Sequence, residues 1–92
     1  MALLETTQLE DFLSEHDGWE MAGDSLVRTF SFEDFAEALS FVVAVGLKAE
    51  RAFHHPDIDI RWNRVTLRLS THAEGGITEK DTELAAAVES LV

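Results

Sequence analysis

The chain has 92 residues, and from that length we expect one compact domain spanning residues 1–92. Eighteen Asp and Glu residues against seven Lys and Arg residues give a formal net charge of -11, which excludes direct nucleic-acid binding because the chain would repel the phosphate backbone. With 46% hydrophobic residues, one proline and no cysteine, the chain is expected to fold around a single apolar core without disulfides.

The first half of the chain predicts a helix, a hairpin and a long helix. Near the amino end, apolar side chains recur at helical spacing at Leu9, Phe12 and Leu13, behind a capping box of Thr7 and Glu10, and Gly18 ends this helix. Residues 19–22 and 26–30 are separated by Gly-Asp-Ser, a composition that predicts a β-hairpin. Ser31 and Asp34 then have the spacing of an amino-terminal cap for the long helix.

The long helix is apolar on more than one face. Its main stripe consists of Phe32, Phe35, Ala36, Leu39, Val42, Val43, Gly46 and Leu47. A second set lies off that stripe and consists of Ala38, Phe41 and Val45. Because packing on a single sheet cannot cover both sets, we expect the extra face to meet another subunit.

The second half predicts two strands and a last helix. Residues 58–62 and 65–69 alternate apolar and polar side chains, which is typical of half-buried antiparallel strands with a tight connection at Asn63 and Arg64. Thr78 and Asp81 form a capping box for the final helix. The order αββαββα predicts an α+β fold, a two-layer sandwich in which helices cover a four-stranded antiparallel sheet.

The residues suited to chemistry lie between Glu50 and His72. Glu50 and His54 are four residues apart, so on a continuing helix the carboxylate would orient the imidazole. Pro56 disfavours helical geometry at His55, so the two adjacent rings are expected to flank a pocket and to point in different directions. Histidine exchanges protons near neutral pH, which suits acid and base catalysis on a small substrate.

Ordinary structural explanations stand beside this interpretation. A histidine at a helix end often interacts with the last carbonyl groups, Glu50 could be a solvated helix residue, and His72 could be an exposed loop residue. His16 has only such an explanation. A zinc site of His54, His55 and His72 with Glu50 or Asp57 is a rival, but adjacent histidines rarely face one ion, so we predict no bound metal.

The start of the chain bears on location. Residues 1–9 contain Glu5 and no Lys or Arg, so they lack the charged beginning and apolar stretch of a secretory signal. No uninterrupted apolar segment is long enough to cross a bilayer. We therefore expect a cytoplasmic protein with no membrane partner. We also expect association between copies, because a domain this short without disulfides gains stability from it.

The run Glu50-x3-His54-His55-Pro56, followed by Trp62, His72 and Asp81, resembles the signature of the pterin-4a-carbinolamine dehydratases. The similarity extends over roughly residues 17–92 and includes the segments 18–19, 30–35, 69–72 and 75–78. Two positions depart from the family pattern, since Trp62 stands where Tyr is frequent and Ile58 where an aromatic residue is common.

The resemblance implies dehydration of 4a-hydroxytetrahydrobiopterin to quinonoid dihydropterin, without a metal or redox cofactor, in pterin recycling after an aromatic amino acid hydroxylase has acted. It also implies a homodimer that joins sheets edge to edge, and often a homotetramer built through the long helices. Family members also include non-catalytic binding proteins, among them a coactivator-type dimerisation partner and assembly factors. We favour the enzyme because the whole set of histidines is present.

Residue roles also follow from the resemblance alone. It implies that His54, His55 and His72 are catalytic, with His55 as the base for the pterin nitrogen proton and His54 or His72 as the acid for the departing hydroxyl. Glu50 would orient His54, and Asp81 would support the site or act mainly as a helix cap. The implied substrate contacts are Trp19, Pro56 and Thr71.

Overall fold

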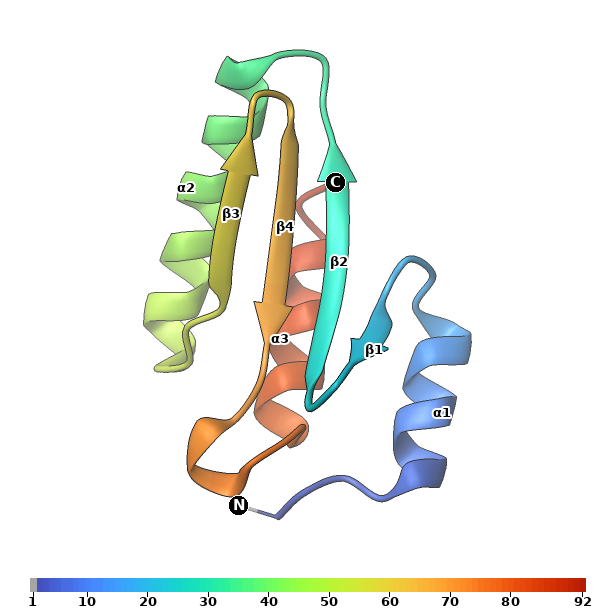
Figure 1. Cartoon of the computed structure of the whole chain (residues 1–92). Helices are drawn as coiled ribbons and strands as arrows, with labels where there is room; N and C mark the ends of the chain where they lie inside the picture. The colour runs from blue at the N-terminus through green and yellow to red at the C-terminus, as the bar shows by residue number, and fades with distance from the viewer. Residues whose placement is uncertain (1) are drawn as a thin grey trace.

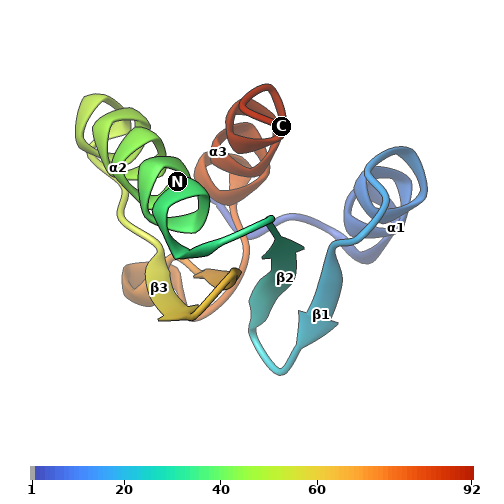
Figure 2. The ribbon, with the colours of Figure 1, turned by 90° about the horizontal axis from the view of Figure 1, so that it is seen from above.

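The structure is a computed structural model that describes residues 2–92. Its elements follow in the order α1 (Thr6–Glu15), β1 (Glu20–Ala22), β2 (Ser25–Ser31), α2 (Phe35–Ala52), β3 (Asp57–Arg61), β4 (Arg64–Leu69), the short 3-10 helix η1 (His72–Glu74) and α3 (Glu79–Glu89) (Figure 1). The strands form one antiparallel sheet in the order β1-β2-β4-β3. The three α-helices lie on one face of this sheet (Figure 2), so the predicted α+β sandwich and its element order are confirmed.

The core lies between the central strands and the helices. Val65, Leu67 and Leu69 alternate along β4 and are buried against the helical layer, as the period-2 pattern predicts. Each large apolar side chain buried in this way contributes about 1.5–3 kcal/mol to folding. The two central strands β2 and β4 pair over six residues, so they form the rigid floor on which α2 and α3 are placed.

Helix α2 packs its second apolar set against the sheet and leaves much of its main stripe exposed. Its buried residues are Ala38, Phe41, Val45 and Ala49, which include the entire second set. The small alanine side chains allow the helix to lie close to the sheet. Four large residues of the main stripe are instead 44–64% exposed, namely Phe35, Leu39, Val43 and Leu47. The helix is therefore apolar on two faces as predicted, but the prediction that the second set forms the extra face is wrong.

Three local predictions also need correction. Helix α1 begins two residues earlier than its predicted cap implies, because Glu5 and Gln8, and not Thr7 and Glu10, form its capping box. The cap of α2 is Asp34, whose side chain accepts the Glu37 N–H, while residue 31 is the last residue of β2. Trp62 lies in the turn between β3 and β4 with a left-handed φ of 49°, so it is not part of the strand. No helix within residues 2–92 is long and apolar enough to cross a bilayer.

Candidate active site

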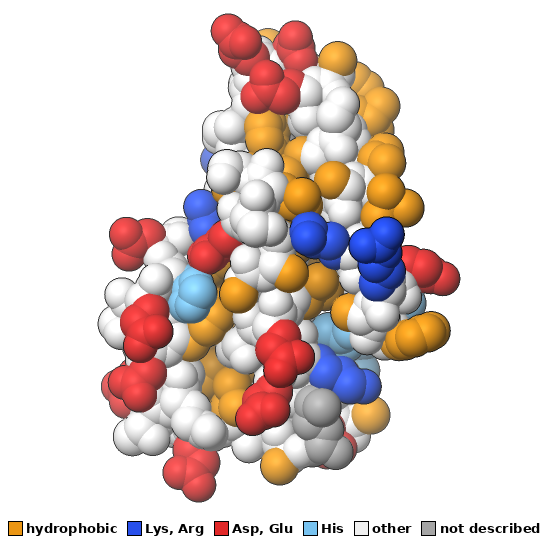
Figure 3. Space-filling model, turned by 180° about the vertical axis from the view of Figure 1, so that it is seen from behind, with side chains coloured by type: hydrophobic (Ala, Val, Ile, Leu, Met, Phe, Trp, Pro, Cys, Tyr) orange, Lys and Arg blue, Asp and Glu red, His pale blue; other side chains and the backbone are white. Residues whose placement is uncertain are grey.

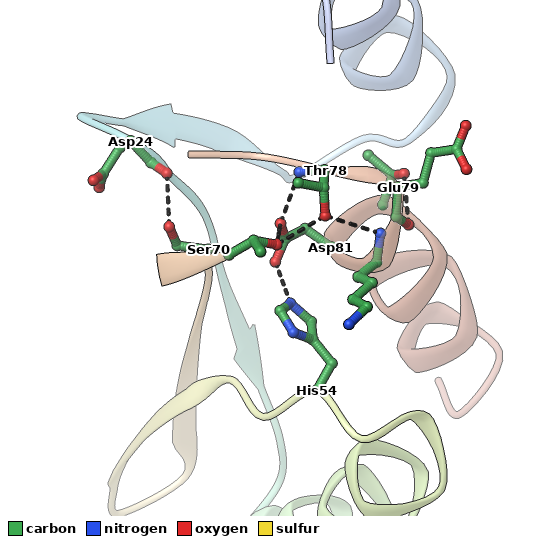
Figure 4. Close-up of polar contacts among 9 residues, drawn as sticks. Asp24, His54, Ser70, Thr78, Glu79 and Asp81 are labelled. Atoms are coloured by element: carbon green, nitrogen blue, oxygen red, sulfur yellow. Dashed lines mark hydrogen bonds and ion pairs between the residues drawn. The ribbon is translucent and has the colours of Figure 1, made fainter. Parts of the chain in front are cut away.

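His54 lies directly beyond the end of α2, and the chain geometry there determines where its ring points. The helix ends at Ala52, and Phe53 adopts the left-handed conformation with φ 52°, which closes the last turn. The His54 N–H still bonds to the Ala49 carbonyl at 3.2 Å. This bond holds the backbone of His54 against the helix while its side chain leaves the helical face and turns toward α3 (Figure 4).

The His54 ring is held by a buried carboxylate. Its Nε2 lies 2.5 Å from Oδ1 of Asp81, whose side chain is completely buried (Figure 4). The other carboxylate oxygen, Oδ2, accepts the Thr78 N–H at 2.9 Å and the Thr71 hydroxyl at 2.7 Å. An ionised carboxylate only accepts hydrogen bonds, so His54 must carry its proton on Nε2 when the imidazole is neutral.

The remaining ring nitrogen of His54 is available for proton transfer. Within residues 2–92, Nδ1 has no hydrogen-bond partner, and it is not one of the buried atoms left unsatisfied, so it reaches solvent. A carboxylate that orients one nitrogen and leaves the other as a proton acceptor is the arrangement of the His–Asp pair in serine hydrolases. The arrangement can therefore move a proton to or from a molecule bound beside His54.

Asp81 has two functions that the sequence left as alternatives. It completes the capping box of α3 with Thr78, and it also orients His54. Thr71, just after β4, joins the same carboxylate and bonds to the Thr78 hydroxyl at 2.8 Å. The end of α2, the end of β4 and the start of α3 therefore converge on one buried group.

The predicted pairing of Glu50 with His54 is wrong. Glu50 Oε1 lies 2.9 Å from Nε2 of His55, and its spacing to His54 loses its meaning because α2 ends at Ala52. The side chains of this pair are 78% and 63% exposed, so their attraction contributes at most about 1 kcal/mol. The two adjacent rings have different partners: His54 is fixed in the protein, whereas His55 lies at the surface.

Two other predicted site residues, His72 and Pro56, have no side-chain hydrogen bond to this network within residues 2–92. His72 begins η1 directly after Thr71, but its side chain is exposed and makes no hydrogen bond within the described residues. Pro56 is partly buried between His55 and β3. The structure thus joins His54, Asp81 and Thr71 by hydrogen bonds and does not join His72 to them.

Trp19 lies in the hydrophobic core and does not line the pocket beside His54. It is 4% exposed, packs edge-on against Phe30 and donates its indole N–H to Glu89 Oε1 at 3.1 Å. Glu89 also accepts from Arg28 at 3.2 Å and lies 2.8 Å from His16 Nδ1. The predicted pocket position of Trp19 is therefore not found, and its contacts indicate a structural role that attaches α1 to α3.

A pocket of about 380 Å³ opens beside His54 between α2 and α3, a size that suits a small molecule. In a view of the helical face, histidine surface lies between Lys and Arg side chains (Figure 3). The pocket is lined by Lys48, Arg51, Ala52, His54, Lys80, Glu83, Leu84 and Ala87.

The cations of this pocket escaped the sequence analysis. Lys48 and Arg51 are three residues apart near the end of one helix, and Lys80 begins another, so only the packing of the two helices brings them together. A larger pocket of about 660 Å³ lies at the other end of α2 and contains no histidine. Among residues 2–92, no three His, Cys, Asp or Glu side chains are grouped as metal ligands would be.

Comparison with known proteins gives a consistent relationship over the whole chain. The family described as "Pterin 4 alpha carbinolamine dehydratase" matches residues 2–91. A protein of Thermomicrobium roseum, provisionally named pterin-4-alpha-carbinolamine dehydratase, is 52% identical over 91 residues, which cover 99% of this chain and 98% of the relative. A protein of Roseiflexus castenholzii with the same provisional name is 47% identical over 91 residues, which again cover 99% of this chain and 98% of the relative.

Solved structures agree with this relationship. The crystal structure of a transcriptional coactivator/pterin dehydratase from Brucella melitensis has a TM-score of 0.92 and 33% identity, covering 97% of each chain. A pterin dehydratase-like protein described as a RuBisCO assembly factor in the alpha-carboxysome shares the fold, with a TM-score of 0.69 and 24% identity over 83% of this chain and 90% of that one. From the match over residues 2–91 and from relatives near 50% identity, the chain belongs to the pterin-4-alpha-carbinolamine dehydratase family.

Proposed function

We propose that this protein is a dehydratase that converts 4a-hydroxytetrahydrobiopterin to quinonoid dihydropterin and water. In this reaction the bond between C4a and the hydroxyl oxygen breaks, the adjacent ring nitrogen loses its proton, and a carbon–nitrogen double bond forms. The hydroxyl leaves as water after it gains one proton. No electrons are exchanged with another molecule, so the protein only has to place an acid and a base beside the substrate.

The observation that carries this proposal is the hydrogen bond between His54 and the buried Asp81 at the edge of a pocket. When His54 holds a proton on each nitrogen, Asp81 balances the charge at Nε2, and Nδ1 donates to the departing hydroxyl. His54 is preferred to His72 as this acid because no hydrogen bond within residues 2–92 orients the His72 ring. His55, one residue away, accepts the proton of the ring nitrogen, and Glu50 holds its other side.

A coupled assay tests this function. An aromatic amino acid hydroxylase generates the 4a-hydroxypterin, and its absorbance decay is followed with and without the protein. We expect wild-type protein to accelerate the decay and His55→Ala to remove nearly all of the acceleration. Because the His55 side chain is 63% exposed, this substitution leaves the fold intact. Arg61→Ala, an exposed change on β3, serves as the control, and an inactive wild type would overturn the proposal.

Protein association is a second candidate function, favoured by the exposed face of α2. Four large apolar residues spaced four apart run along this helix, where a monomer would leave them in water. The Brucella melitensis relative is described as a transcriptional coactivator as well as a pterin dehydratase. We propose that in this chain the same face meets another copy in a homotetramer, and that homodimers join sheet edges. Light scattering after size exclusion measures the mass of the assembly, and a monomer would contradict this proposal.

A further inference from the structure

The cations of this chain are distributed unevenly. Lys and Arg residues number seven in a chain with a net charge of -11, yet three of them, Lys48, Arg51 and Lys80, line the pocket beside His54. The only carboxylate in the same lining is Glu83. With a neutral His54, and without the buried Asp81 carboxylate behind it, the side chains that line the pocket carry a net charge of about +2, opposite in sign to the protein as a whole.

In the part of the chain that the structure describes, these cations have no ion-pair partner that would explain their position. Arg28 and Arg61 form ion pairs with Glu89 and Asp59, whereas none of the three pocket cations forms one within residues 2–92. Lys80 lies in the first turn of α3, where the helix dipole disfavours a positive charge. Helix electrostatics explain the two cations near the end of α2, but they leave Lys80 unexplained.

The charge of the pocket suits one class of anion. A phosphate monoester carries about -1.5 to -2 charges near neutral pH and offers three acceptor oxygens, one for each cation. A carboxylate carries a single charge and would leave one positive charge unbalanced. The remaining lining is apolar, from Ala52, Leu84 and Ala87, which favours a small organic molecule over a bare inorganic ion.

We propose that this pocket binds the phosphate group on the side chain of a phosphorylated pterin, with Lys48, Arg51 and Lys80 as its donors. This inference rests on the dehydratase function proposed above and names the substrate class of the same site. The reacting ring lies beside His54, and the phosphate of the side chain lies against the cations that flank this histidine. The three cations are thus substrate-positioning residues that favour a phosphorylated over a neutral side chain.

Two measurements test this inference. First, inorganic phosphate and pyrophosphate are titrated into the protein at constant ionic strength, with binding followed by backbone amide shifts in NMR. We expect shifts around His54, Lys80 and Arg51, and we expect Lys80→Met to weaken binding roughly tenfold, the effect of losing one charge-assisted hydrogen bond. The double variant Arg61→Met/Arg64→Met removes two cations from the outer face of the sheet and should bind phosphate as wild type does.

Second, dehydration is compared for 4a-hydroxytetrahydropterins that carry either a phosphate monoester or a neutral hydroxyl on the side chain. We expect Lys80→Met to raise KM roughly tenfold for the phosphorylated substrate alone, with kcat unchanged. If wild type binds no phosphate and turns over both substrates equally, the anion site is overturned and the dehydratase stands. If phosphate binds with the expected dependence on Lys80 but neither substrate reacts, the anion site stands and the dehydratase proposal fails.

Discussion

The hydrogen bond between Asp81 and His54 gives a prediction that separates chemistry from folding. In Asp81→Asn, the amide oxygen can take the place of Oδ2 and still accept the Thr78 N–H and the Thr71 hydroxyl. The amide NH2 then faces Nε2 of His54, which must become an acceptor. The proton of neutral His54 therefore moves to Nδ1, the nitrogen that the proposed mechanism uses.

The size of the effect follows from the contacts that are lost. The substitution weakens three charge-assisted hydrogen bonds, from His54, Thr71 and Thr78, into neutral ones, at about 1 kcal/mol or less each, which together costs about 1.5–3 kcal/mol of stability. For a domain of this size, a loss near 2 kcal/mol lowers Tm by roughly 10 °C. The effect on dehydration should be larger, at least about 100-fold in kcat, because an amide group that faces Nε2 neither accepts the Nε2 proton of the acid form of His54 nor balances its charge; the same Asp→Asn change in a comparable His–Asp pair costs about 10⁴-fold.

Three measurements on Asp81→Asn and wild-type protein test this prediction. Decay of the 4a-hydroxypterin measures rate, thermal unfolding measures stability, and ¹⁵N NMR of the His54 ring reports which nitrogen carries the proton. Asp34→Asn is the matched control, since it also neutralises a helix cap, and asparagine caps helices well, so we expect less than about 0.5 kcal/mol and no change in rate. If Asp81→Asn loses stability but keeps full activity, Asp81 is only a cap and the mechanism is wrong.

Three further predictions follow from the contacts. Glu50→Gln should lower the dehydration rate less than tenfold and leave Tm within about 1 °C, because its pair with His55 is exposed; a large loss of stability would contradict this. Glu89→Ala should destabilise the fold by about 2–3 kcal/mol and speed hydrogen exchange in α1, since Trp19, Arg28 and His16 lose their shared partner; unchanged exchange would argue against it. Val43→Asp should reduce the mass measured by light scattering, and an unchanged assembly would exclude the exposed face of α2 as an interface.

Most of the fold could be predicted because its signals are local. The alternation from Val65 to Leu69 and the capping box of Thr78 and Asp81 depend on neighbours a few residues apart, and both are confirmed. The face that α2 buries is not a local property. Both apolar sets suit a sheet, and the choice depends on how closely the helix approaches it, which small residues such as Ala38 and Ala49 permit.

The site shows the same division between local and distant information. The sequence shows directly that His54 and His55 are neighbours, but it does not show which carboxylate each ring bonds to. A single left-handed residue, Phe53, ends α2 before His54 and so removes the helical spacing on which the Glu50 pairing depends. Asp81 lies 27 residues from His54, so only the packing of α3 against α2 shows that the cap carboxylate also orients the ring.

The double function of Asp81 has a consequence for how this site tolerates change. In the capping box, residue 81 only has to accept the Thr78 N–H, which a Glu, Gln, Asn or Asp side chain can do, so folding accepts several residues there. Orienting a neutral imidazole through Nε2 requires an acceptor without protons, and at a completely buried position only a carboxylate provides this while also accepting from Thr78 and Thr71. Capping α3 therefore tolerates several residues at position 81, whereas orienting His54 requires Asp. A carboxylate that the fold alone does not need at this position is what proton transfer at His54 would require.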